Sequence, residues 1–340
     1  MRQVLFGVII ISILTNCSEK ENLTLDQEIQ TLGDPSQIFT ITSDKTDTIQ
    51  AKNGTRLIIR SNTFVFNDGQ DATDSIQIEL KEVFDKSDMI LNGLGTVSDG
   101  RLIESFGMIF LRATSNGKEL RIKDNSSITV SIPNKKSGYD GELFYGIQTD
   151  SLLNWDYAGT TKDTIEIVET RVPLSDGLES IKRTTYKYVS GMREFVSDTL
   201  FTRKNQNIYE YAADSVAARP RESYQFGLTN LGWINCDRFI EIKEKVDLEI
   251  EIENYSQPIG YLVFADINSV MQVLFNSKGK AAVKNLPKNY QADLVVLDKI
   301  KGNVMWTKQS LKIGAESKLT LETRKISTDE LKIELERLDK

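Results

Sequence analysis

The residues with the most potential for chemistry lie together in one short stretch, 226–239, which has the sequence FGLTNLGWINCDRF. It contains a tryptophan, a cysteine, an asparagine and an adjacent Asp-Arg pair. We single out four candidate binding residues here: Trp233, Asn235, Asp237 and Arg238. A tryptophan ring can stack against a ligand, and the Asp-Arg pair can bind a charged one. The alternative is structural, since such a pair often closes a turn while its tryptophan packs in a core.

Cys236 is a candidate nucleophile in the same stretch. The chain contains no histidine, which removes Ser-His-Asp and Cys-His activation, histidine general bases and most catalytic zinc sites. Only Arg238 or a lysine is left to lower the pKa of the thiol. A lone cysteine between Ile234 and Phe239 is more often a small buried hydrophobic residue, so we expect Cys236 to lie in a core. We therefore assign no catalytic residue, although chemistry that needs only carboxylates, Lys, Ser or Tyr stays open.

The other cysteine, Cys17, ends a segment with the features of a secretory signal. Arg2 and the amino terminus are positive, an apolar run of roughly eleven residues follows, and the chain turns polar after Cys17. This run is too short for a bilayer span, which needs about 20 residues. The tetrad Leu14-Thr15-Asn16-Cys17 resembles the lipobox of bacterial lipoproteins. An ordinary secretory signal is the alternative, because Asn16 stands where Gly, Ala or Ser is usual.

The lipobox resemblance implies that residues 1–16 are a removed signal peptide and that Cys17 is lipidated. Two or three acyl chains would hold the protein at a membrane nearly permanently. Residues 17–38 are then the lipid anchor and a tether. The cluster Ser18-Glu19-Lys20-Glu21 resembles the surface-export signal of Bacteroidetes lipoproteins, with a solvated tether as the alternative.

The net charge and the cysteine count limit the classes of partner that the chain is expected to bind. Removal of residues 1–16 takes away only Arg2 and leaves 41 basic against 49 acidic side chains, a net charge of −8. Such a chain lacks the basic face that nucleic-acid binding needs, so no nucleic-acid partner is expected. With Cys17 acylated, Cys236 has no partner for a disulfide or a multi-cysteine metal site. We expect no metal site and no cofactor.

Residues 39–134 have the short strands and turn signals of a β-sandwich. Asn-Gly pairs at 53–54 and 116–117 lie between extended segments and predict hairpins. The stretch is also similar to the β-sandwich module of ankyrins, netrin receptors and zonula-occludens proteins, through the runs 53–59 (NGTRLII) and 61–64 (SNTF). In those proteins the module is an interaction and scaffolding element, so the resemblance implies binding rather than catalysis.

Residues 135–245 are expected to form a middle β-rich domain. Segments 143–147 and 152–157 predict a hairpin that carries Trp155. A short helix is expected over 208–218, ended by Pro220.

Residues 246–326 predict a second all-β unit. Leu248, Ile250 and Ile252 alternate with acidic residues, as in a strand with one acidic face. The segment Asn285-Leu286-Pro287 resembles the transthyretin-like modules of carboxypeptidases and outer-membrane receptors.

Residues 327–340 predict a C-terminal helix. Ser327 and Glu330 have the spacing of a capping box, and Leu331, Leu335 and Leu338 would share one helical face. A strand is the alternative, because Leu331 and Leu335 also alternate with polar residues around Ile333.

The sequence therefore predicts a mainly β chain of two or three sandwich-like domains in tandem, with a signal peptide before them and a short C-terminal helix. The segment 232–239 (GWINCDRF) and the first sandwich are similar to stretches of uncharacterised surface lipoproteins of Bacteroidetes. We expect an outer-membrane lipoprotein exposed at the cell surface, with a binding or assembly role and with envelope proteins or glycans as partners. The alternative is a carboxylate-dependent hydrolase acting on glycans, with its site between the middle and last domains.

Overall fold

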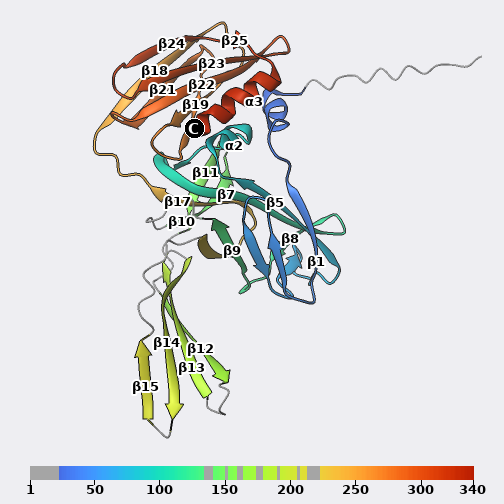
Figure 1. Cartoon of the computed structure of the whole chain (residues 1–340). Coiled ribbons are helices and arrows are strands. Elements are labelled where there is room, and N and C mark those ends of the chain that lie inside the picture. The colour runs from blue at the N-terminus through green and yellow to red at the C-terminus, as the bar shows by residue number, and fades with distance from the viewer. Residues whose placement is uncertain are drawn as a thin grey trace, which may run out of the picture.

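The structure is a computed structural model that describes residues 23–133, 141–149, 152–158, 164–173, 179–189, 192–204, 207–212 and 223–340. Residues 1–22, which include the expected signal segment and Cys17, lie outside the described residues. Four β-sheets and three short helices make up the described part, and the strands pair antiparallel apart from β18 (Lys245–Glu253) with β24 (Lys318–Glu322) (Figure 1). The prediction of a mainly β chain with sandwich-like units is confirmed. No helix among the described residues has the length and apolar character that a membrane crossing needs.

The first sandwich consists of two sheets, which we call sheet I and sheet II. Sheet I has the order β1-β5-β7-β17-β10-β11, with β4, β6 and β8 attached. Its strands are β1 (Gln37–Thr42), β4 (Phe64–Phe66), β5 (Ser75–Val83), β6 (Val97–Ser98), β7 (Arg101–Ser115), β8 (Lys118–Ile122), β10 (Glu142–Gln148), β11 (Leu153–Tyr157) and β17 (Gly232–Phe239). Sheet II has the order β12-β13-β14-β16-β9-β3-β2, with β15 beside β14. Its strands are β2 (Asp47–Gln50), β3 (Arg56–Ile59), β9 (Ile128–Pro133), β12 (Thr164–Pro173), β13 (Glu179–Val189), β14 (Met192–Lys204), β15 (Asn207–Ala212) and β16 (Ser223–Leu228).

The core of this sandwich is built by alternation along the strands. Ile76, Ile78 and Leu80 on β5 are buried against Val130 and Ile132 on β9 in one apolar cluster. Both Asn-Gly pairs connect hairpins, β2 with β3 and β7 with β8, as predicted. At the second pair, Asn116 and Gly117 have φ of 51° and 74°, which is why residues that tolerate positive φ occupy this tight turn.

The second sandwich consists of sheets III and IV. Sheet III has the order β20-β19-β22-β23-β25, and sheet IV has the order β21-β18-β24. The further strands are β19 (Ile259–Phe264), β20 (Val270–Leu274), β21 (Lys280–Pro287), β22 (Gln291–Ile300), β23 (Asn303–Lys312) and β25 (Arg324–Lys325). Leu248, Ile250 and Ile252 on β18 are buried in its core, while Asp247 and Glu249 are exposed, so the predicted acidic face is confirmed.

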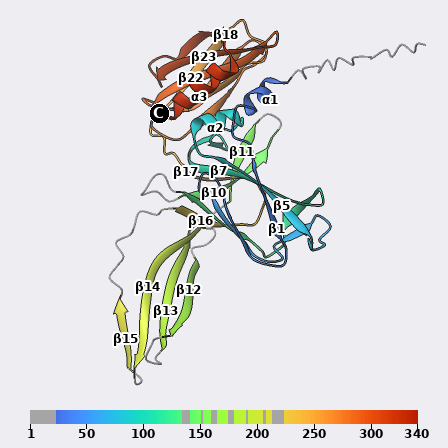
Figure 2. The ribbon, with the colours of Figure 1, turned by 45° about the vertical axis from the view of Figure 1, so that its right-hand side comes forward.

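A third core joins the two sandwiches, and we call it the central core. It lies between the outer face of sheet I and sheet III, and the helices α1 (Leu25–Gln30), α2 (Lys86–Leu91) and α3 (Thr328–Glu336) contribute to it (Figures 1 and 2). Sheet III is therefore covered on both faces. This explains the unbroken apolar run on β22, where Leu294 and Val296 enter the second sandwich and Val295 and Leu297 enter the central core.

The strand pairing divides the chain differently from the expected boundary near 134, whereas the second sandwich begins with β18 at Lys245, next to the expected boundary at 245. β10, β11 and β17 belong to sheet I and β16 belongs to sheet II, so the ends of the expected middle domain complete the first sandwich. β12 to β15 continue sheet II as an arm that projects from the stack (Figure 1). The β10–β11 hairpin forms as predicted. The helix expected from 208 is wrong over 208–212, where β15 pairs with β14, and 213–220 lie outside the described residues.

The C-terminal helix is confirmed, and the strand alternative is wrong. Leu331, Leu335 and Leu338 are buried, whereas Ile333 is 52% exposed. Ser327 Oγ accepts a hydrogen bond from the Glu330 backbone N–H at 3.2 Å. The helix closes over the central core because Leu331 and Leu335 share the face that it turns inward, and Leu338 extends this contact from the 3-10 turn Arg337–Asp339 that follows.

Candidate functional site

Strand β17 carries all four residues that we predicted to bind a ligand. It lies in the middle of sheet I and pairs with β7 on one side and with β10 on the other. Because side chains alternate along a strand, Ile234 and Cys236 enter the first core, whereas Trp233 and Asn235 point to the opposite face; a β-bulge then shifts the register between Cys236 and Asp237. The four predicted residues therefore enter different surroundings.

Asn235 and Asp237 form a buried polar network with Ser105 of β7. Both side chains are 0% exposed. Ser105 Oγ donates to Asn235 Oδ1 at 2.9 Å, and Asn235 Nδ2 donates to Asp237 Oδ2 at 2.5 Å. Burial raises the pKa of the Asp237 carboxyl well above its usual range, and the charge of Glu104 adds to this shift. These groups stabilise the centre of the sheet and have no surface to offer a dissolved ligand.

Arg238 is held in an ion pair with Glu104 of β7. Arg238 Nε donates to Glu104 Oε2 at 2.8 Å, and Nη2 lies 2.6 Å from the same oxygen. Glu104 is 1% exposed, and its other oxygen accepts the Asn268 backbone N–H at 3.4 Å. Asn268 precedes β20, and its side-chain amide donates to the carbonyls of Phe84 and Ser105 at 3.0 Å. This network ties sheet I to sheet III.

Cys236 is a core residue, as we interpreted it. Its side chain is 0% exposed and lies in the first core. Burial raises the pKa of its thiol well above the usual range, which keeps it in the protonated, non-nucleophilic form.

Trp233 differs from the other three predicted residues because it is partly exposed and lines a cavity. Its ring lies 5.3 Å from that of Phe110, its neighbour on β7, at a tilt of 53°. Trp233 lines a cavity of 490 Å³, together with residues of α1, β5, β11 and sheet III. The edge of the central core is open at this point.

This cavity is the middle part of an extended depression between the two sandwiches, which we call the interdomain groove. A cavity of 960 Å³ adjoins it on one side and shares Asp26 and Ile259 with it. A cavity of 290 Å³ adjoins it on the other side and shares Leu153 and Leu274, among others. The groove follows the line along which sheets I and III meet, beginning at α1.

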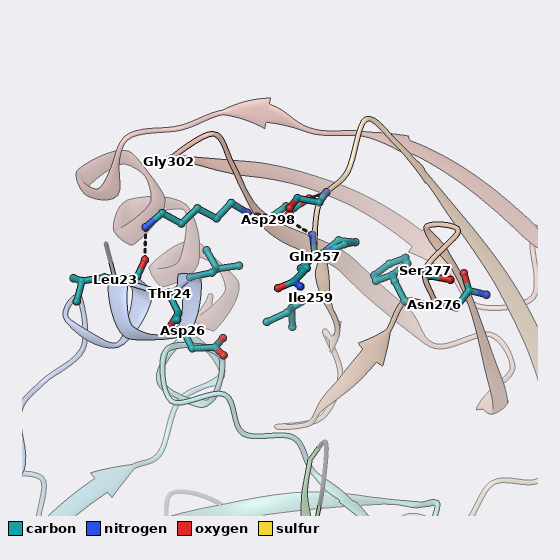
Figure 3. A pocket seen from close by; sticks show the side chains of 14 residues that line it. Leu23, Thr24, Asp26, Gln257, Ile259, Asn276, Ser277, Asp298 and Gly302 are labelled. Atoms are coloured by element: carbon teal, nitrogen blue, oxygen red, sulfur yellow. Dashed lines mark hydrogen bonds between the residues drawn. The ribbon is translucent and has the colours of Figure 1, made fainter. Parts of the chain in front are cut away.

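Helix α1 forms one wall of the outer end of the groove (Figure 3). Thr24 and Gln27 form a capping box that starts the helix. Lys299 Nζ donates to the Leu23 carbonyl at 2.6 Å and to Glu28 Oε2 at 2.7 Å, which fastens the helix to sheet III. Figure 3 shows Asp26 and Ile259 facing the same open space, with Asn276 and Ser277 on the opposite wall.

Asp298 also lines this end of the groove, but its carboxylate is committed to the backbone. Asp298 Oδ2 accepts the Ser256 N–H at 2.6 Å, and Oδ1 accepts the N–H of Gln257 at 3.0 Å. Asp298 is 1% exposed, so it shapes the wall rather than presenting a carboxylate to a ligand.

Three polar side chains that line the middle cavity have no hydrogen-bond or ion-pair partner in the part of the chain that the structure describes: Asp26, Gln30 and Lys81. Asp26 and Gln30 are exposed on α1, whereas Lys81 on β5 is partly buried. Burial lowers the pKa of the Lys81 ammonium. These groups are available to a ligand.

The sequence analysis did not identify Asp26, Gln30 and Lys81 as candidate binding residues. We expected residues 17–38 to be a tether, although Thr24 and Gln27 have the spacing of a capping box, followed by Leu25 and Ile29 on one helical face. That signal predicts the helix. The position of this helix beside Trp233 could not be predicted from the sequence, because roughly 200 residues separate the two segments.

Within the described ranges, no group of three or more His, Cys, Asp or Glu side chains could hold a metal ion. Comparison of the chain with protein-family models, with curated proteins and with solved structures finds no match.

Proposed function

We propose that the chain is a lipid-anchored binding protein of the bacterial cell envelope, exposed at the outer-membrane surface, whose ligand site is the interdomain groove. The observation that carries the proposal is the groove itself, which combines a partly exposed tryptophan with the unpartnered polar groups of Asp26, Gln30 and Lys81. Apolar concave surface with a few polar groups is the usual composition of a ligand site. Envelope proteins and glycans are the candidate partners.

The anchor and the groove are close along the chain. Leu23 lines the outer end of the groove and follows the proposed lipidated Cys17 by six residues. Six residues span at most about 20 Å when fully extended. A ligand in the groove would therefore lie near the membrane surface, which suits a role in envelope binding or assembly.

The alternative of a two-carboxylate hydrolase fits the groove less well. Glycoside hydrolysis needs two carboxyl groups flanking the scissile bond. The carboxylates that line the three cavities are Asp26 and Asp298, and both oxygens of Asp298 accept backbone hydrogen bonds. Asp26 is then the one carboxylate with free oxygens, an arrangement that favours binding over hydrolysis.

Site-specific photocrosslinking in living cells tests the groove as the ligand site. A photoreactive residue at Gln148, which is exposed and lines the groove, is expected to give a specific adduct. The matched control is Lys118, exposed on the β7–β8 hairpin away from the groove. Equal labelling from the two positions, or none from Gln148, would contradict the proposal.

Labelling with a fatty acid tests the anchor. We expect label on the wild-type chain, loss of label and of membrane association in Cys17→Ala, and removal of the protein by protease added to intact cells. A chain recovered unlabelled in the cytosol, with its leader uncut, would rule out the envelope role.

A further inference from the structure

The middle of the interdomain groove contains a row of side chains that the fold brings into register. On sheet I, Lys81 of β5 lies opposite Phe110 of β7, and Phe110 lies opposite Trp233 of β17. All three are partly exposed. A cation and two aromatic rings therefore form a continuous floor at the open edge of the central core.

The next strand leaves room for the tryptophan. Gly146 of β10 lies beside Trp233, and a Cβ atom there would be 2.7 Å from the Trp233 Cβ. It would also lie 2.9 Å from Cδ2 of Leu153. Any larger residue at position 146 would displace the ring, so the glycine fixes where the tryptophan lies in the groove.

The unpartnered polar groups of the middle cavity are Lys81 in this floor and Asp26 and Gln30 on α1, and together they balance in charge and in hydrogen-bonding capacity. Asp26 offers acceptors only, Lys81 offers donors only, and the amide of Gln30 offers both. An anionic ligand would be repelled by Asp26 and a cationic one by Lys81. A neutral ligand with many hydroxyl groups satisfies all three, because each hydroxyl donates and accepts.

A pyranose ring matches this arrangement. It has an apolar face of C–H groups that can lie on an indole ring and a rim of hydroxyls that can bond to polar side chains. The adjoining cavities of 960 and 290 Å³, which share lining residues with the middle cavity, leave space for further sugar units.

We propose that the groove binds a neutral oligosaccharide, with one sugar ring stacked on Trp233 and its hydroxyls bonded by Asp26, Gln30 and Lys81. This inference rests on the proposed function and specifies its ligand class. The sugar can be free or can be the headgroup of a glycolipid, since the chemistry is the same.

Fluorescence titration of the full chain in detergent provides the test. The chain contains three tryptophans, of which Trp155 is 0% and Trp306 is 3% exposed, so a sugar in the groove reports through Trp233. The probes are maltohexaose, cellohexaose, laminarihexaose and mannohexaose, with hexagalacturonate and a neutral hexapeptide as comparison ligands. Phosphatidylcholine vesicles with and without a glycolipid of the same sugar distinguish the lipid-borne from the free source.

We expect saturable binding of at least one neutral hexasaccharide, free or lipid-borne, and weaker binding of both comparison ligands. Trp233→Ala should weaken it at least about tenfold, as loss of an aromatic anchor does. Trp233→Phe and Gln30→Ala should each weaken the binding of the hexasaccharide less than Trp233→Ala does. These two variants still test the proposal if Trp233→Ala fails to fold. Trp306→Phe, which changes a buried ring of the central core that does not line the groove, is the control and should leave the affinity unchanged.

Preferred binding of hexagalacturonate or of the peptide would overturn the neutral saccharide while leaving the groove as a binding site. Absence of binding by every neutral probe would also overturn it, as would binding that Trp233→Ala and Gln30→Ala do not affect. Failure of the proposed function is a separate result, because it requires that the Gln148 crosslinker give no specific adduct in cells.

Discussion

The two ends of strand β17 lie in one sheet yet have different surroundings. At one end, Asn235 and Asp237 are completely buried, and Arg238 is paired with Glu104. At the other end, Trp233 reaches the interdomain groove. Trp233 precedes these three residues by only two to five positions along the chain. The comparison teaches that reactive or polar residues that are neighbours in sequence need not form one site. One end of a strand can stabilise the contact between two sheets while the other end lines a groove that can bind a ligand.

The largest effect is expected at the closed end, from loss of the Arg238 side chain. Arg238→Ala should lower the free energy of unfolding by about 3 kcal/mol, because the buried Glu104 carboxylate loses its charged partner. Glu104→Ala should cost less, since Arg238 is partly exposed and its guanidinium can reach water. Chemical denaturation of both variants measures the difference, and the reverse order would contradict a buried role for Glu104.

A somewhat smaller loss is expected from the neutral part of the same network. Asn235→Ala should destabilise by about 2 kcal/mol, because Ser105 and Asp237 lose their common partner in a fully buried site. Asn230→Ala is the matched control, exposed just before the strand, and should change stability by less than about 0.5 kcal/mol. Similar losses of unfolding free energy for the two variants would mean that solvent reaches the polar network of Asn235.

Replacement of Asp237 tests the protonation state of the closed end. Its pKa is raised in the folded chain, so the folded state holds this proton more tightly, and stability should fall as pH rises above the ordinary carboxyl range. Asp237→Asn keeps the shape without the charge and should flatten that dependence. Denaturation midpoints measured from pH 4 to pH 8 check this, and equal slopes for the two proteins would argue that Asp237 is ionised.

A second pH effect is expected at α2, which lies between the sandwiches. Burial and the neighbouring charges of Asp85, Asp339 and Asp34 raise the pKa of Asp88 from 3.8 to about 6. Because the folded-state pKa is the higher one, stability should decrease as pH rises from about 4 to about 6. Asp88→Asn should remove this decrease and give the more stable protein at pH 7. Asp26→Asn, on the exposed surface of α1, serves as the control and should leave the dependence unchanged.

The smallest effect on stability is expected at the open end. Trp233→Phe should cost no more than about 1 kcal/mol, because the ring is partly exposed and phenylalanine keeps most of its contact with Phe110. The same change at the fully buried Trp155 also removes the hydrogen bond to the Gly95 carbonyl and should cost more. Thermal melting of the two variants compares them directly. Equal losses would mean that Trp233 is as much a core residue as Trp155.

Much of the local structure could be predicted from the residues themselves. Leu248, Ile250 and Ile252 predict a strand with one buried face, because apolar residues at every second position line one side of a β-strand. The Asn-Gly turns and the helix that begins after Ser327 depend on local backbone preferences, so they form as expected. The inclusion of β17 in the first sandwich could not be predicted in this way, since β17 joins sheet I by pairing with β7 and β10, which lie roughly a hundred residues earlier in the chain.

The amino-acid sequence by itself determined the fold class, the core position of Cys236 and the lack of histidine chemistry, because composition, periodicity and turn preferences are local properties. Only the tertiary structure decided that Asn235 and Asp237 are sealed, that Arg238 fastens two sheets together, and that Trp233 meets Asp26, Gln30 and Lys81 in one groove. The physical reason is that burial and encounter depend on which distant segments pack together, and the packing of sheet I against sheet III is a property of the whole chain.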